Sequence, residues 1–195
     1  MVAAVVALVA LLAAGTVPAR ALSAPVREPD VVFVPTPQEV VEEMLRLAAV
    51  RKGDVLYDLG SGDGRIPVTA ARLYGIRAVG IDIDPARIAE ARENARRGGV
   101  AKLVEFRLGD LFKMDFREAS VVTLYLLPEL NLKLRPRLLA ELKPGTRIVS
   151  HQFDMGDWPP ERKVELNGRT IYLWTVPPRK GRLEGKSGRT ASSTP

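Results

Sequence analysis

The stretch Tyr57–Arg65 reads YDLGSGDGR and places three glycines within nine positions. A short apolar run over residues 54–60 predicts a strand, and residues 65–75 have a helical pattern that stops at Gly75. Backbone N–H groups at the start of a helix bind anions, and glycines let a ligand approach the backbone closely. The stretch therefore predicts a ligand-binding turn between a strand and a helix.

Strand and helix patterns alternate along the rest of the chain. A hairpin is expected near its end, because the dipeptide Asn167-Gly168 lies between two alternating apolar patterns. This order predicts an α/β fold with a doubly wound, mostly parallel, Rossmann-like sheet and a C-terminal antiparallel hairpin. Further strands are expected at residues 77–84, 102–110, 119–127 and 146–153, and further helices at residues 35–50, 84–99 and 128–142.

Two of the expected helices begin with capping signals. Thr36, followed three residues later by Glu39, has the pattern of a capping box at the start of the first helix. Asp84 stands directly before Pro85, which is typical of an N-cap residue followed by a first-turn proline. Both signals predict a side chain that accepts a hydrogen bond from the first turn.

The spacing of the glycines separates two kinds of ligand. A dinucleotide-binding turn has the pattern G-x-G-x-x-G; Gly60 and Gly62 fit it, but Arg65 takes the third place and Gly64 comes one residue early. Asp58, two residues before the first glycine, suits a ligand ammonium group better than a pyrophosphate. S-adenosylmethionine carries an ammonium and a carboxylate at one end, and free backbone N–H groups in the turn would match the carboxylate.

Three acids follow or end three successive predicted strands. Asp58 ends the first, Asp82 ends the second, and Asp110 follows the third. Because ligands of open parallel sheets bind beyond the carboxyl ends of the strands, we expect the three carboxylates to converge on one crevice. Asp82 is expected to hold the ribose hydroxyls of an adenosine and Asp110 to lie near its adenine amino group.

Composition narrows the function further. The chain contains no cysteine, which excludes a thiolate nucleophile and thiolate metal ligands, and we predict no metal site. The formal charge is +6, but residues 179–195 hold five basic residues and one acid, which leaves 24 basic and 22 acidic residues elsewhere. The charge excess lies largely in this tail, and the small excess of two in the rest of the chain gives little support for a nucleic-acid-binding groove.

Five stretches together resemble a known family. They are VPTPQEVVEEML (34–45), YDLGSGDGRI (57–66), GIDIDP (80–85), ASVVTLYLLPELNLKLRPRL (119–138) and ELKPGTRIVSHQFDMGDW (141–158). The chain resembles class I, seven-strand S-adenosylmethionine-dependent methyltransferases. Within them it is similar to protein-lysine methyltransferases that include archaeal broad-specificity members and mitochondrial members acting on inner-membrane proteins. The resemblance implies a cofactor site formed by Asp58, Gly60, Gly62, Gly64, Asp82 and Asp110.

The implied reaction is attack by a lysine amine on a sulfonium methyl group, with a protein as the substrate, a membrane-embedded one among the candidates. Tyr125, after the fourth predicted strand, is expected to orient the amine, and packing is the alternative for this residue. His151 is either an aid to proton removal or a structural histidine, and Trp158 either part of a lid or of an ordinary loop. Gln152 departs from the family pattern, in which an acid usually follows the histidine.

Other function classes stay open at this point. A nucleic-acid methyltransferase usually has an Asn/Asp-Pro-Pro-aromatic motif after the fourth strand, and LYLLPEL lacks it. A small-molecule methyltransferase normally carries additional elements over its pocket, whereas this chain is nearly minimal. A non-catalytic S-adenosylmethionine-binding module is the non-enzyme alternative.

The ends of the chain differ in composition from its middle. Residues 1–22 form an apolar leader, residues 30–177 the expected methyltransferase domain, and residues 178–195 a basic tail predicted to be disordered. The leader resembles a signal or an anchor, and Arg20 and Arg27 lie on its carboxyl side. We expect a membrane-bound protein with its domain facing the cytoplasm; export after cleavage near Ala21 is the alternative.

Overall fold

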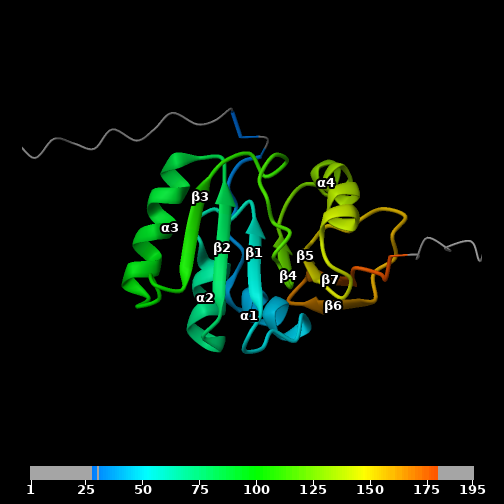
Figure 1. The fold of residues 1–195 in the computed structure, drawn as a ribbon, viewed down its shortest axis with the longest axis horizontal. Coiled ribbons are helices and arrows are strands. Elements are labelled where there is room, and N and C mark those ends of the chain that lie inside the picture. Colours follow the sequence, from blue (N-terminus) through cyan, green and yellow to red (C-terminus); the bar gives the residue numbers. More distant parts are fainter. Residues whose placement is uncertain (1–27, 30, 180–195) are drawn as a thin grey trace, which may run out of the picture.

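The computed structural model describes residues 28–29 and 31–179 of the 195-residue chain. The described residues form four helices and seven strands (Figure 1). The helices are α1 (Gln38–Leu47), α2 (Arg65–Tyr74), α3 (Pro85–Arg97) and α4 (Pro128–Glu141). The strands are β1 (Val55–Leu59), β2 (Arg77–Asp82), β3 (Val104–Leu108), β4 (Val121–Leu124), β5 (Arg147–His151), β6 (Arg162–Leu166) and β7 (Arg169–Thr175).

All seven strands belong to one sheet, in the order β3-β2-β1-β4-β5-β7-β6 (Figure 1). The first five strands pair in parallel, whereas β7 pairs antiparallel with both β5 and β6. The strand order reverses between β1 and β4, and such a point opens a crevice at the carboxyl ends of the two strands. The predicted α/β fold with a mostly parallel sheet and an antiparallel C-terminal hairpin is confirmed.

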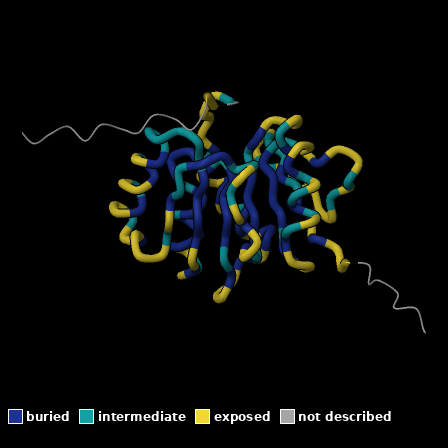
Figure 2. Tube along the Cα trace, turned by 45° about the horizontal axis from the view of Figure 1, so that its top comes forward, coloured by how far each residue is buried: buried dark blue, intermediate teal, exposed yellow. Residues whose placement is uncertain are grey.

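Helices cover both faces of the sheet. Val40 and Met44 of α1 belong to a buried cluster with Ala70 of α2 and Val149 of β5. A second cluster joins Leu134 and Leu138 of α4 to strand residues of the opposite face, among them Leu124 and Trp174. Figure 2 shows the strands as the buried centre of the molecule, with exposed residues along the helices and loops. The apolar runs of the parallel strands therefore reflect burial from both sides.

The C-terminal hairpin has the turn that its sequence predicts. β6 and β7 pair through Leu166 and Arg169, so that Asn167 and Gly168 are the only residues between the strands. Both have left-handed backbone conformations, with φ of 50° and 72°. Asparagine and glycine tolerate such values, and two consecutive positive φ angles match the right-handed twist of a hairpin.

Of the two capping predictions, one is confirmed and one is wrong. The Asp84 side chain accepts a hydrogen bond from the N–H of Ala86 at the start of α3. At the start of α1, however, the N-cap residue is Pro37 and no side chain caps the helix. The Thr36 hydroxyl instead lies 3.3 Å from Nδ1 of His151, a residue 115 positions away. A tertiary contact has taken the hydroxyl that the local pattern assigned to a cap.

The predicted membrane-bound placement is corrected. Within the described ranges, no helix has the length and apolar character needed to cross a membrane. The apolar leader, residues 1–22, on which that prediction depended, lies outside the described residues.

Gly64 determines how closely α2 and β3 approach each other. It precedes α2 with φ of 76°, and a Cβ at this position would lie 2.4 Å from the Phe106 ring and 2.8 Å from Cβ of Ala91. Gly75, at the other end of α2, has a similar φ of 63°, but a Cβ there would meet nothing within 4 Å. Both glycines thus have a positive φ, but only Gly64 is packed so closely that a side chain would clash.

We expect Gly64→Ala to destabilise the fold by about 2 to 4 kcal/mol, because a left-handed alanine and an overfilled contact both raise the energy. Gly75→Ala is the matched control, with a cost of about 1 kcal/mol from the backbone alone. Chemical denaturation of both variants provides the measurement. Equal losses in the two would show that the contact with Phe106 and Ala91 imposes no constraint.

Candidate functional site

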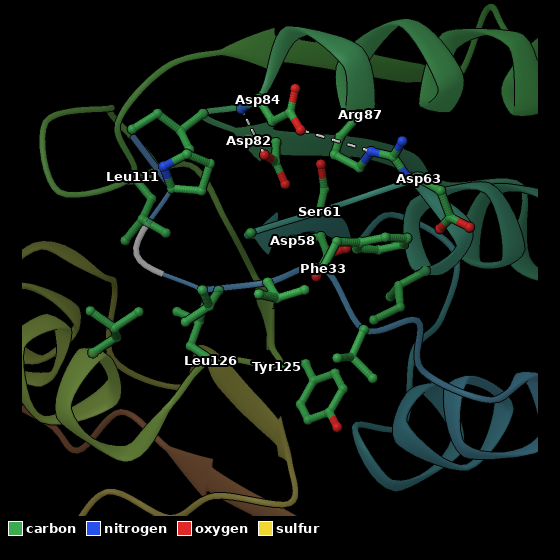
Figure 3. Close-up of a pocket in the computed structure, with 18 of the residues that line it drawn as sticks. Phe33, Asp58, Ser61, Asp63, Asp82, Asp84, Arg87, Leu111, Tyr125 and Leu126 are labelled. Carbon is green, nitrogen blue, oxygen red and sulfur yellow. Dashed lines mark hydrogen bonds and ion pairs between the residues drawn. The ribbon is translucent and has the colours of Figure 1, made fainter. Parts of the chain in front are cut away.

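A cavity of about 490 Å³ lies at the carboxyl ends of the parallel strands, beside the reversal in strand order. Its size is in the range of pockets for small molecules and cofactors. The turns after β1 and β2, the ends of β3 and β4, and the segment before α1 form its walls. We call residues 31–36 of that segment the lead segment. Figure 3 shows side chains from these elements pointing toward a common space.

The three predicted acids meet in this cavity. Asp58, Asp82 and Asp110 all line it, and Asp58 is only 2% exposed. Oδ1 of Asp58 accepts a hydrogen bond of 2.8 Å from the Thr123 hydroxyl on β4. Among the described residues, no group of three or more His, Asp or Glu side chains is arranged to hold a metal ion. The convergence expected from the strand ends is present in the structure.

The carboxyl groups at the acidic end of the cavity have raised pKa values because they are buried. Burial raises the pKa of Asp58 to about 8, and the negative charges of Asp82 and Asp63 add to the effect, which outweighs the opposing hydrogen bond from Thr123. The pKa of Asp82 is also raised, again mainly by burial. A cationic group placed here would stabilise the ionised carboxylates, so the cavity is suited to a ligand with a positive charge at this end.

Asp82 connects the two turns that follow β1 and β2. Its Oδ2 accepts a hydrogen bond of 2.7 Å from the N–H of Gly62, and its Oδ1 accepts one of 2.9 Å from the N–H of Asp84. Each carboxylate oxygen can accept a second hydrogen bond, because it has two lone pairs. Asp82 can therefore hold both turns in place and still bind hydroxyl groups of a ligand.

The backbone of the glycine turn is less available than its sequence suggests. The N–H groups of Gly60 and Ser61 both donate to the carbonyl of Ile81 at 2.9 Å, and that of Gly62 donates to Asp82. The N–H of Gly64 donates to the carbonyl of Ser61. The neighbouring strand and the turn itself therefore use the N–H groups of Gly60, Ser61, Gly62 and Gly64, so these four are not the free groups that the sequence led us to expect in the turn.

The glycine turn contributes to the cavity in another way. Gly60 lines the wall with φ of 87°, and a Cβ there would lie 2.8 Å from Cδ2 of Leu126. Ser61 also lines the cavity, and its buried Oγ has no hydrogen-bond partner among the described residues. A buried hydroxyl without a partner is rare in proteins and indicates an absent ligand or water. The Ser61 oxygen itself lies against Gly80 of β2, so the contribution of the turn to the cavity is the space that Gly60 leaves open.

Gly62 and Gly64 shape the turn from outside the cavity lining. A Cβ on Gly62 would lie 2.2 Å from the ring of Phe33, so the lead segment lies directly against this glycine. Gly64 packs against Phe106, as described above. The structure thus brings Asp58, Gly60, Asp82 and Asp110 together at the cavity and places Gly62 and Gly64 behind it.

The sequence indicated residues 34–36 of the lead segment through the family resemblance, but it did not predict that the segment lines the cavity. The Arg87 guanidinium lies 5.0 Å from the centre of the Phe33 ring, a cation–π arrangement. Arg65 donates from Nη1 to the carbonyl of Thr36 at 2.9 Å and forms an ion pair with Asp63 at 2.6 Å. Phe33 and Arg87 lie outside the motifs noted in the sequence, and the contact of Arg65 with Thr36 joins segments that are far apart in the chain.

Tyr125 lines the cavity on the side opposite the acids. It follows β4 directly, and in Figure 3 its hydroxyl points away from Asp58 and Asp82. The ring centre lies 4.0 Å from that of His151, which is fully buried and does not itself line the cavity. Burial and the positive charge of Arg169 lower the pKa of His151 to about 4, so its imidazole is neutral at pH 7.

Trp158 does not contribute to the cavity wall. Its ring lies 6.1 Å from that of Trp174, and its carbonyl accepts a hydrogen bond of 2.9 Å from the Trp174 indole N–H. These contacts place Trp158 in the packing between the loop after β5 and the C-terminal strand. The lid interpretation of this residue finds no support in the geometry.

Comparison with known proteins gives an independent view of this site. Residues 58–162 match the family of the ANTKMT methyltransferase domain. A protein-lysine N-methyltransferase of Saccharolobus islandicus is 43% identical over 76% of this chain and 95% of its own length. The adenine nucleotide translocase lysine N-methyltransferase of mouse is 38% identical over 75% of this chain, and the match spans 64% of the mouse enzyme.

A solved structure adds the cofactor. The structure described as an RNA methyltransferase from Salinibacter ruber in complex with S-adenosyl-L-homocysteine is 60% identical to this chain. It covers 76% of this chain and 97% of its own, with a TM-score of 0.74. The matched family region begins at Asp58 and contains the glycine turn, Asp82, Asp110 and Tyr125. The chain therefore belongs to the ANTKMT methyltransferase domain family and is an S-adenosylmethionine-dependent methyltransferase.

Proposed function

We propose that this enzyme transfers a methyl group from S-adenosylmethionine to the side-chain amine of a lysine in a protein. The observation that carries the proposal is a single cavity with buried acids at one end and Tyr125 at the other. The similarity to a protein-lysine methyltransferase over 95% of that protein supports the acceptor class. The mouse relative is named for action on a translocase, and a membrane-embedded acceptor remains a prediction for this chain.

The cofactor residues are assigned by matching charges and hydrogen-bonding groups. Asp58 would receive the ammonium group, Asp82 the ribose hydroxyls and Asp110 the adenine amino group. Arg65, which lines the cavity, would bind the carboxylate in place of the occupied backbone N–H groups. The raised pKa of Asp58 and the positive charge of Arg65 fit a ligand with these two opposite charges.

The protein must supply a neutral amine in the correct position. When bound, S-adenosylmethionine would supply a methyl group on a positively charged sulfur, and the sulfur–methyl bond would break as the bond from the methyl carbon to the lysine nitrogen forms. A lysine of ordinary pKa costs about 4.6 kcal/mol to deprotonate at pH 7. Transfer of the lysine from water into the cavity lowers this cost, because an apolar environment disfavours the charged form. Tyr125 would orient the amine. The proton that the lysine ammonium loses would pass to solvent.

RNA methylation is a second candidate, because the 60% identical protein from Salinibacter ruber is described as an RNA methyltransferase. Two features of this chain favour the protein acceptor. The residues after β4 are Tyr125-Leu126-Leu127-Pro128, without the motif usual in nucleic-acid base methyltransferases. The basic excess of the sequence is concentrated in residues 179–195, only the first of which the structure describes.

Radioactive methyl transfer separates the two candidates. The enzyme is incubated with labelled S-adenosylmethionine and a lysate from cells lacking the gene, divided into membrane and non-membrane fractions. Label that resists ribonuclease, disappears with protease and maps to lysine by mass spectrometry is expected. Label lost with ribonuclease and retained with protease would replace the protein acceptor by RNA.

Asp58→Asn should separate stability from cofactor binding. The folded-state pKa of Asp58 lies above that of the unfolded chain, so the wild type loses stability as pH rises from about 4 to 8. Asparagine removes this loss and can still accept the Thr123 hydrogen bond. We expect a gain on the order of 1 to 3 kcal/mol at pH 8, because a difference of one in pKa corresponds to about 1.4 kcal/mol.

The same variant should bind S-adenosylmethionine about 10- to 100-fold more weakly, since a hydrogen bond between charged partners is lost. Denaturation at pH 5 and pH 8 and calorimetry with the cofactor are the two measurements. Wild-type affinity at pH 8 would remove Asp58 from the ammonium site, and an unchanged dependence of stability on pH would contradict its raised pKa.

Tyr125→Phe tests the acceptor end. If the hydroxyl orients the amine, we expect kcat to fall about tenfold while the cofactor Kd stays the same, because one hydrogen bond to the amine is lost. Tyr172→Phe is the matched control, since Tyr172 packs against Trp174 and does not line the cavity. Equal rates for wild type and Tyr125→Phe would leave Tyr125 with a packing role only.

A further inference from the structure

His151 is a buried histidine that the proposed reaction does not use. It ends β5, is 0% exposed and is the single histidine of the sequence. Its Nδ1 lies 3.3 Å from the Thr36 hydroxyl, and its ring contacts Tyr125 at 4.0 Å between centres, tilted by 40°. Its Nε2 has no hydrogen-bond partner among the described residues. A phenylalanine would carry no unpaired Nε2, but it would leave the buried Thr36 hydroxyl without this partner.

The backbone after His151 is strained in a way that adds to this arrangement. Gln152 has φ of 69°, and the N–H of Phe153 donates to the His151 carbonyl at 2.9 Å. A hydrogen bond between residues two apart, across a residue with positive φ, is typical of the rare and strained form of the γ-turn. Gln152 is held by Thr170, which exchanges two hydrogen bonds with it, at 2.7 and 3.3 Å.

The turn also builds the surroundings of Tyr125. Phe153 stacks on Tyr125, with 6.3 Å between ring centres and 20° between ring planes. Tyr125 therefore lies between contacts to His151 and Phe153, the two residues on either side of the strained Gln152. Strain and unpaired polar atoms in a folded protein occur most often where function requires a particular geometry. Here that geometry is at the acceptor end of the cavity.

A proton-accepting role does not fit this histidine. Its pKa is lowered to about 4, first by burial and then by the charge of Arg169. An imidazole with so low a pKa is a poor acceptor for the proton of a lysine ammonium, whose ordinary pKa is about 10.4. His151 also does not line the cavity, whereas its two partners Thr36 and Tyr125 do. His151 can therefore act on the reaction only indirectly, by fixing the positions of Thr36 and Tyr125.

We propose that His151 is a positioning residue that fixes Thr36 of the lead segment and the Tyr125 ring relative to each other at the acceptor end of the cavity. Thr36 and Tyr125 come from segments far apart in the sequence, and the imidazole is the group that touches both. This inference rests on the proposed acceptor role of Tyr125. Beyond the proposed function, it assigns to His151 the role of holding Tyr125 in place. It also includes Thr36 of the lead segment in the acceptor end of the cavity.

His151→Phe is the central variant, because it keeps a ring against Tyr125, loses the contact with Thr36 and removes the unpaired Nε2. We expect a melting temperature about 2 to 10 °C below wild type, because the buried Thr36 hydroxyl loses its partner. We expect kcat to fall about fivefold, the effect of one hydrogen bond, with an unchanged cofactor Kd. His151→Asn retains a polar group near the position of Nδ1. Its kcat should therefore lie between those of His151→Phe and wild type.

A double-mutant cycle tests whether His151 acts through its contact with Thr36. Thr36→Val removes the same contact from the other side, so its effect on kcat should not add to that of His151→Phe. Hydrogen–deuterium exchange of residues 31–36 gives a readout that does not need methyl transfer, and both single variants should exchange faster there than wild type. Gln38→Ala, which removes only hydrogen bonds to Glu42 and Thr69, is the exchange control.

Non-additive effects together with faster exchange support the inference. Additive effects on kcat, or exchange of residues 31–36 equal to that of wild type, overturn it. If the wild-type enzyme methylates no protein lysine, the proposed function fails, and the exchange experiment alone then decides on His151.

Discussion

The Asp82 carboxylate holds the ligand-binding end of this fold together. It accepts hydrogen bonds from Gly62 in the turn after β1 and from Asp84 in the turn after β2. Because α2 and α3 begin at these turns, one side chain determines where both helices start relative to the sheet. The same residue lines the cavity. One carboxylate therefore both joins the two turns and forms part of the cavity wall, and a substitution at Asp82 changes both.

The gathering of acids around Asp82 has an electrostatic cost in the free protein. Asp58 is buried beside other carboxylates, and its pKa of about 8 means that it is largely protonated at neutral pH. A ligand ammonium would displace that proton and provide the missing positive charge. The free enzyme thus carries a destabilised group, and under the proposed assignment the cofactor ammonium would be its favourable partner. Binding sites commonly show this conflict between stability and function.

Much of the fold and half of the site could be predicted from the sequence because the signals were local. Glycine, proline and capping residues marked the turns, and apolar runs marked buried strands. The convergence of Asp58, Asp82 and Asp110 followed from the geometry of parallel sheets. The prediction failed where distant segments compete for the same groups. Thr36 pairs with His151 instead of capping α1, and Ile81 and Asp82 occupy the N–H groups of the glycine turn.

The lead segment reaches both ends of the cavity within a few residues. Phe33 lies against Gly62 in the glycine turn, and Thr36 touches His151 behind the acceptor end. Three residues of extended chain span at most about 10 Å, so these two contacts are joined by a short connection. The shape of the cavity wall beside the glycine turn is therefore coupled, through three residues of chain, to the position of Thr36 beside His151.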